Sequence, residues 1–115
     1  YIDPPYSGTM NNYFGFYGLL DELICEKKLR SFNNNFTDKK EIELNLDKLF
    51  SKLLNYKYCA ISYNNRAYPT KEKIIKILKK YTSKIEVFEK QHNYQITGKT
   101  QKTTNIEYLF LGKVK

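Results

Sequence analysis

The order of apolar patterns along the 115 residues predicts an α/β fold, namely half of a doubly wound sheet that is mostly parallel and ends in an antiparallel hairpin. Three observations predict it. A strand stops at a proline pair and is followed by two amphipathic helical patterns. A short apolar strand pattern then precedes a third helix. Two further strand patterns, joined by a polar loop, close the chain.

The first half of the chain supplies one strand end and two helices. Tyr1-Ile2 ends a strand, because a proline at position 4 cannot donate the amide hydrogen bond that a central strand needs. Apolar residues then recur at helical spacing over 16–24 and again over 46–54, with a polar loop between the two patterns. Each helix is therefore expected to bury one stripe.

The second half reads as a strand, a helix and a hairpin. Residues 56–63 form an aromatic and apolar run too short for a helix, so they predict a buried strand. Thr70 is expected to cap a helix with an apolar stripe from Ile74 to Tyr81. Strand patterns at 84–94 and 106–111 flank a polar loop and predict an antiparallel hairpin.

Positive charge is concentrated near the carboxyl end. The net charge is +8, and residues 71–115 alone hold 11 lysines against 4 glutamates. A one-sided excess favours a polyanionic partner such as nucleic acid, while a lysine-rich solvated face is the alternative. Apolar runs stay well below the roughly 18 residues of a membrane span.

The cysteines and the histidine give no metal signal. Cys25 and Cys59 lack a CxxC spacing, and His92 is the sole histidine in the sequence. We expect two buried thiols in a reducing cytoplasm, no metal site, and an ordinary strand position for His92.

The strongest chemical signal is Asp3-Pro4-Pro5-Tyr6 at a strand end. The exocyclic amine of a base is a poor nucleophile, because its lone pair is delocalised into the ring. Acceptors aimed at its hydrogens favour a more tetrahedral nitrogen. The Asp3 carboxylate suits one hydrogen, and the carbonyl of Pro4, stiffened by Pro5, suits the other. Tyr6 is placed to stack on a base taken out of the helix. A plain strand-ending turn is the alternative.

Three blocks of the sequence resemble Dam-like adenine-N6 DNA methyltransferases, in that family's order. Residues 1–24, YIDPPYSGTMNNYFGFYGLLDELI, resemble motif IV and the helix after it. Residues 60–65, AISYNN, resemble a later strand-end pattern, usually Leu-Ser-Tyr-Asn-Asp, with Asn65 where Asp is common. The closing hairpin, 94–110, resembles the family's carboxyl end. The resemblance covers nearly the whole chain.

The resemblance implies the C-terminal half of a Rossmann-like, S-adenosylmethionine-dependent methyltransferase sheet, together with a set of site residues. The catalytic set would be Asp3, Pro4, Pro5 and Tyr6. The substrate-binding set would be Tyr6, Ser62, Tyr63, Asn64 and Tyr94, where packing is the alternative for Tyr63 and Tyr94. Cofactor contacts would come from Asp3 and Ile2. DNA phosphates would meet Lys99 and Lys102, unless these lie on an unstructured polar hairpin tip.

The sequence departs from the family in its glycines. The family carries an upstream Phe-x-Gly-x-Gly motif for the cofactor, and the 5 glycines here include no Gly-x-Gly. We therefore expect residues 1–115 to be a partial catalytic domain, inactive alone, without the cofactor-binding half and the target-recognition region. Expected partners are duplex DNA, the missing N-terminal half and, through an exposed sheet edge, a second copy. No membrane partner is expected.

The sequence thus predicts a site-specific DNA adenine-N6 methyltransferase, cytoplasmic, bacterial or phage-type, and part of a restriction–modification system. Methylation of cytosine N4 or of an RNA amine is the alternative within the same chemistry. A basic nucleic-acid-binding module with a decayed site is the alternative from another class, and in that module Asp3 would be dispensable.

Overall fold

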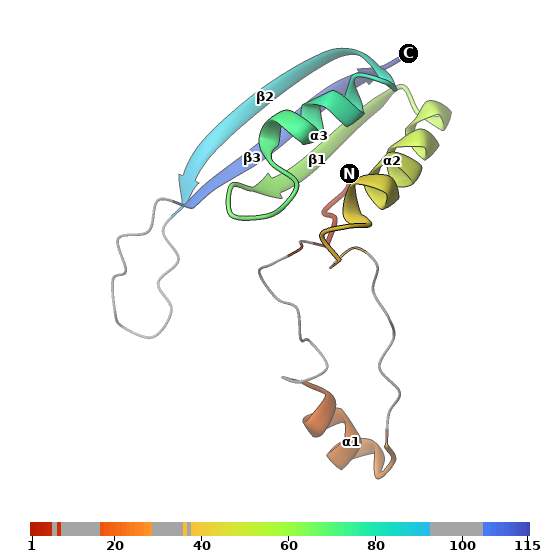
Figure 1. Ribbon diagram of the computed structural model, residues 1–115, viewed down its shortest axis with the longest axis vertical. Coiled ribbons are helices and arrows are strands. Elements are labelled where there is room, and N and C mark those ends of the chain that lie inside the picture. Colours follow the sequence, from red (N-terminus) through yellow and green to blue (C-terminus); the bar gives the residue numbers. More distant parts are fainter. Residues whose placement is uncertain (6, 8–16, 29–35, 37, 93–104) are drawn as a thin grey trace.

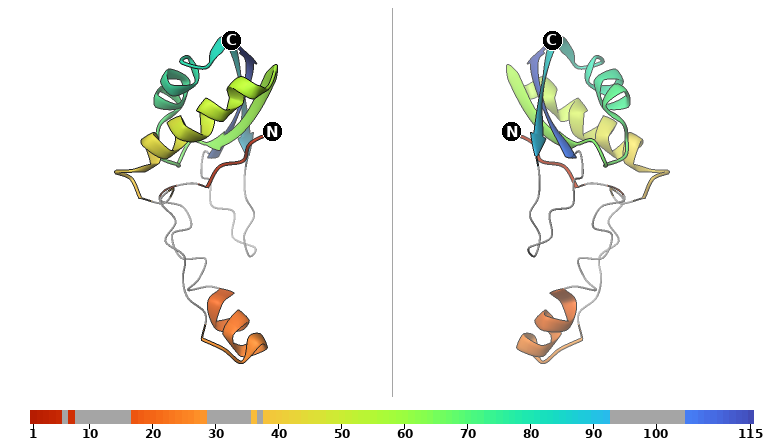
Figure 2. Two further views of the ribbon diagram at one scale, coloured as in Figure 1. Left: turned by 90° about the vertical axis from the view of Figure 1, so that its right-hand side faces the viewer. Right: turned by 90° about the vertical axis from the view of Figure 1, so that its left-hand side faces the viewer.

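The computed structural model describes residues 1–5, 7, 17–28, 36, 38–92 and 105–115. These residues form an α/β structure, in which two helices cover one face of a three-stranded sheet (Figures 1 and 2). The elements, in chain order, are α1 (Leu19–Cys25), α2 (Ile42–Ser51), the 3-10 helix η2 (Lys52–Asn55), β1 (Tyr58–Asn64), α3 (Lys71–Leu78), β2 (Thr82–His92) and β3 (Asn105–Val114).

The strand order is β1-β3-β2, and the expected mostly parallel sheet is not seen among these three strands. Both β1 and β2 pair antiparallel with β3. They therefore run in the same direction, as a strand–helix–strand crossover requires, but the last strand lies between them. In that central place the backbone groups on both edges of β3 find partners. The predicted antiparallel hairpin is confirmed, and it folds inward rather than onto an outer edge.

The core lies between the inner face of the sheet and the two helices. Side chains along β1 alternate between buried and partly exposed positions, so that Cys59, Ile61 and Tyr63 all face the helices. The predicted stripes of the second and third helices are confirmed as core at Leu46, Phe50, Leu53, Ile74, Ile77 and Leu78. Leu54, predicted in the same stripe, is 54% exposed, and Ile42 joins the core from outside the predicted stripe. The sequence order of apolar residues therefore predicted most of this packing correctly.

Gly112 lets the central strand lie close to both neighbours. A Cβ at this position would stand 2.6 Å from the Cys59 sulfur and 2.9 Å from Cγ2 of Thr82, both of which are buried. A side chain here would force the buried side chains of Cys59 and Thr82 to shift. The same burial raises the pKa of the Cys59 thiol.

Helix α1 differs from its expected burial. Its helical spacing is confirmed, but none of its residues is buried, and Leu19, Leu20, Leu23 and Ile24 are between 57% and 77% exposed. Cys25 is exposed as well, so the expectation of two buried thiols holds for Cys59 and is wrong for Cys25. The helix lies apart from the sheet in every view (Figures 1 and 2). Helices in the described part of the chain are too short or too polar to cross a membrane.

Two adjacent residues of β3 test whether one face of the sheet packs against the helices while the other is open. Phe110 is 1% exposed and faces the helices, whereas Leu111 is 38% exposed on the opposite face. We expect Phe110→Ala to lower the free energy of unfolding by about 3–5 kcal/mol, because it leaves a cavity in the core. Leu111→Ala should cost about 1 kcal/mol or less. Urea unfolding of the 115-residue chain, in which the Leu111 face is open, measures both values by circular dichroism, and equal losses would contradict the assignment.

Candidate active site

The first residues of the chain attach to the free edge of β1. The Ile2 amide donates to the carbonyl of Ala60 (2.9 Å), and the Ser62 amide donates to the carbonyl of Ile2 (3.0 Å). These bonds form a parallel bridge between Ile2 and Ile61. The next bond of such a ladder needs an amide at position 4, which Pro4 lacks. Pairing therefore stops, and Asp3 leaves the sheet beside Ser62.

Three polar side chains meet where the pairing stops. The hydroxyl of Ser62 donates to Oδ1 of Asp3 at 2.9 Å. The phenol of Tyr1 donates to the same Ser62 hydroxyl at 2.8 Å. The structure thus brings Asp3 into direct contact with Ser62, two residues that the sequence predicted for one site from positions 59 residues apart.

The other end of the motif loop is attached as well. Ser7, 1% exposed, forms an antiparallel bridge with Tyr68, whose amide lies 3.4 Å from the Ser7 carbonyl. Pro4 is buried and Pro5 is exposed. The loop that carries the motif therefore crosses from the edge of β1 to the connection before α3. Tyr6, the predicted stacking residue, lies outside the described residues.

A charged network holds Tyr68 in place. Lys73 donates to Glu43 at 2.5 Å and to the Tyr68 hydroxyl at 2.7 Å, and Tyr68 in turn donates to Glu43. The Lys73 ammonium also lies 4.8 Å from the centre of the Tyr68 ring. The hydrogen bond from Lys73, followed by that from Tyr68, lowers the pKa of Glu43, and Glu43 raises the pKa of Lys73. This network fastens α2, α3 and the anchor of the motif loop to one another.

The predicted floor residues divide between the two faces of the sheet. Tyr63 is fully buried among the helices, which favours the packing alternative for it. The Asn64 amide donates to Glu107 at 2.8 Å, and its side-chain oxygen accepts from the Arg66 amide at 2.8 Å, so Asn64 shapes the turn that ends β1. Ser62 contacts the motif directly, through its hydrogen bond to Asp3.

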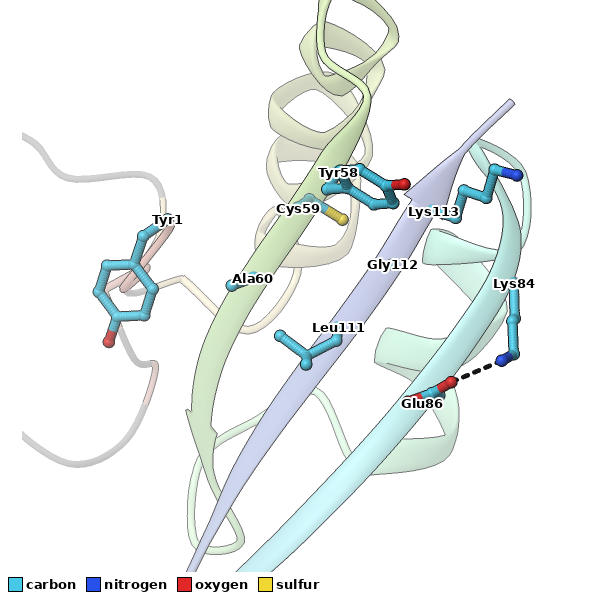
Figure 3. Close-up of a pocket in the computed structure, with 9 residues that line it drawn as sticks. All are labelled: Tyr1, Tyr58, Cys59, Ala60, Lys84, Glu86, Leu111, Gly112 and Lys113. Carbon is cyan, nitrogen blue, oxygen red and sulfur yellow. Dashed lines mark ion pairs between the residues drawn. The ribbon is translucent and has the colours of Figure 1, made fainter.

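The sheet face opposite the helices is open and partly apolar. We call it the open face; it carries Tyr58, Ala60, Ser62 and Asn64 of β1, with their neighbours on β3 and β2. Figure 3 views it with the helices behind the sheet. A shallow hollow on it is lined by Tyr1, Tyr58, Cys59, Ala60, Lys84, Glu86, Leu111, Gly112 and Lys113. Large apolar side chains such as Tyr58 and Phe88 stand exposed there. Large apolar side chains are thus exposed on this sheet face and on α1, whereas the sequence predicted such exposure at a sheet edge.

Several lysines of the basic segment, residues 71–115, form ion pairs with acidic side chains. Lysines 71, 73, 80 and 84 form ion pairs with Glu89, Glu43, Asp47 and Glu86. Two of the four partners come from α2, so Lys73 of α3 and Lys80 just after it join this segment to α2. The other predicted phosphate and base contacts, Lys99, Lys102 and Tyr94, lie outside the described residues. Within the described part, no cluster of three or more His, Cys, Asp or Glu could hold a metal ion.

Sequence reasoning missed four residues that support the site, namely Tyr1, Glu43, Tyr68 and Lys73. Tyr1 could have been found, because alternation along a strand puts it on the same side as Asp3. Glu43 lies in the first turn of α2. Its contacts with Tyr68 and Lys73 join residues 25 and 30 positions away, and no local pattern reports contacts of that range.

Comparison with known proteins relates this chain to a type II methyltransferase. The relative is M2.HphI of Haemophilus parahaemolyticus, which is 45% identical to it over 111 residues. The aligned region is 96% of this chain and 33% of the relative, so the chain spans about a third of that protein's length. No protein-family model matches the sequence. No solved structure is detectably similar to it.

Removing Lys73 should change how stability depends on pH. Because the pKa of Glu43 is lower in the folded state than its ordinary value of 4.5, the pair stabilises the fold above pH 4.5 and loses this effect as pH falls through the folded value. We expect Lys73→Gln to be less stable than wild type at pH 6, with a difference that shrinks below pH 4.5. Urea unfolding across this range measures it.

Lys79→Gln is the matched control for that series, since Lys79, at the end of the same helix, takes part in none of the four ion pairs between described residues. Its curve should follow that of wild type. A Lys73→Gln difference that stays constant with pH would show that packing, rather than charge, accounts for the loss.

Proposed function

We propose that the full-length protein transfers a methyl group from S-adenosylmethionine to the N6 amine of adenine in duplex DNA. The observation that carries the proposal is Asp3 of the Asp-Pro-Pro-Tyr motif, released from the edge of β1 and oriented by Ser62. The 45% identity to a type II methyltransferase supports the same class of reaction. The resemblance to Dam-like enzymes supports adenine over cytosine.

The chemistry asks two things of this chain's own residues. The Asp3 carboxylate accepts a hydrogen bond from one N–H of the target amine. This bond concentrates the lone pair on nitrogen and stabilises the positive charge that develops as the nitrogen–carbon bond forms. The Pro4 carbonyl accepts the other hydrogen. Pro4 is buried and the loop is fastened at Ile2 and Ser7, so both acceptors stay in place during the reaction. Tyr6 stacks on the flipped base.

The residues present fit S-adenosylmethionine only in part. Oδ1 of Asp3 already accepts a hydrogen bond from Ser62, which favours a positioned acceptor for the amine over a cofactor ligand. The sequence offers no Gly-x-Gly for the cofactor. Asp3 and Ile2 therefore have no cofactor contact in the proposed reaction. When bound, S-adenosylmethionine supplies the methyl group, and the rest of a Rossmann-like domain would hold it.

The proposal also covers the substrate, the biological setting and the location of the protein. We propose that duplex DNA is the substrate and is held in part by lysines near the carboxyl end. We further propose that the protein belongs to a restriction–modification system and lies in the cytoplasm. We also propose that the rest of the full-length protein covers the open face and α1, because both leave large apolar side chains exposed. Self-association through the same surface is the competing use of it.

The test is methyl transfer by the full-length protein to unmethylated genomic DNA, with the modified nucleoside identified by mass spectrometry. Wild type should produce N6-methyladenine. Asp3→Ala should reduce the rate by about 10²–10³-fold, as expected when one aligned hydrogen-bonding group of an active site is removed. Asp38→Ala is the matched control: this carboxylate lies in an exposed turn, where it accepts from the Lys40 amide at 2.8 Å, and the variant should act like wild type.

The product distinguishes the alternatives. N4-methylcytosine would keep the reaction type and change the base, and methylated adenine in RNA alone would change the substrate. DNA binding without any methylated nucleoside, unchanged in Asp3→Ala, would favour the binding module and overturn the proposal.

A further inference from the structure

Two hydroxyl groups lie in series behind the motif carboxylate. The Tyr1 phenol donates to Ser62 at 2.8 Å, and Ser62 donates to Oδ1 of Asp3 at 2.9 Å. We propose that Tyr1 and Ser62 form a hydrogen-bond relay that positions the Asp3 carboxylate for methyl transfer. Both are positioning residues, since they act through Asp3. The inference rests on the proposed function and extends it to residues beyond the motif.

The backbone places the three groups together. Tyr1 and Asp3 flank Ile2, so strand alternation turns both toward the open face, while Ile2 packs against the core. Ser62 follows Ile61 and points to the same face. Two backbone hydrogen bonds, from Ile2 to Ala60 and from Ser62 to Ile2, fix this register. The Ser62 hydroxyl therefore lies directly between the side chains of Tyr1 and Asp3.

The relay limits where the carboxylate can turn. Asp3 is exposed, and an exposed carboxylate next to a loop would otherwise sample several rotamers in water. A bond from Ser62 selects one of them. The bond from Tyr1 orients the Ser62 hydroxyl, which could otherwise rotate and accept instead of donate. Each additional donor polarises the next, so the relay strengthens the bond that reaches Asp3.

A double-mutant cycle in the full-length protein tests the relay through kcat for methyl transfer. We expect Ser62→Ala to lower kcat about tenfold. This is the smaller end of the loss expected when a hydrogen bond to a charged group is removed, because Asp3 is exposed. Tyr1→Phe should lower it about threefold. If Tyr1 acts through Ser62, the double variant should lose about tenfold rather than about thirtyfold. KM for DNA and for cofactor should stay within about twofold, because alignment rather than binding is lost.

Conservative and matched variants separate positioning from folding. Ser62→Thr keeps the hydroxyl on a β-compatible side chain and should restore kcat to within about threefold of wild type. Ser83→Ala removes a strand hydroxyl that donates to the Lys113 carbonyl at 3.1 Å, and Tyr56→Phe removes an exposed phenol. Both should act like wild type. Thermal unfolding of each variant reports the fold, and the exposed Tyr1 position carries the test if Ser62→Ala is unstable.

The outcomes separate the two proposals. Three results would overturn the relay while leaving the proposed function intact, provided that wild type is active. The losses of kcat in the two single variants multiply to about thirtyfold in the double variant, Ser62→Ala changes KM, or Ser62→Thr does not restore kcat. Wild type without methyl transfer overturns the proposed function, and the relay with it. The relay is supported if the double variant loses no more kcat than Ser62→Ala, if KM is unchanged, and if Ser62→Thr restores kcat.

Discussion

The insertion of β3 between β1 and β2 is the constraint on which the rest of the structure depends. With β3 on one side, β1 has a single remaining edge, and the Ile2 backbone occupies part of that edge. The motif therefore begins at a fixed position along β1. Gly112 leaves room for the buried side chains of Cys59 and Thr82 on the two flanking strands, so β3 fits between them with both neighbours packed.

The motif loop is held by two kinds of interaction. Its start is fixed by backbone hydrogen bonds to β1, which any sequence could make until a proline ends them. Its far end depends on side chains, because Ser7 pairs with Tyr68 and Tyr68 is held by Glu43 and Lys73. The first attachment is a property of the sheet, whereas the second depends on how α2 packs against α3.

Local patterns predicted what depends on local sequence. The helical stripes containing Leu46 and Ile74, the strand at Ile61 and the strand end at Pro4 follow from spacing and from proline chemistry. The insertion of β3 was not predicted, because alternating strands and helices fix direction but leave the order of strands open. The exposure of α1 was not predicted either, since an apolar stripe does not say what covers it. At the site, Asp3 and Ser62 were predicted, whereas the network around Tyr68 joins distant segments.

Strand β1 carries the core and the site on alternate residues, and this gives its length a consequence of its own. An insertion or deletion of one residue between Ala60 and Tyr63 would rotate the following side chains by half a turn. Core residues would then face water and the polar residues would face the helices. The packing of the core and the contact between Ser62 and Asp3 would then be lost together, so the number of residues in this strand constrains both.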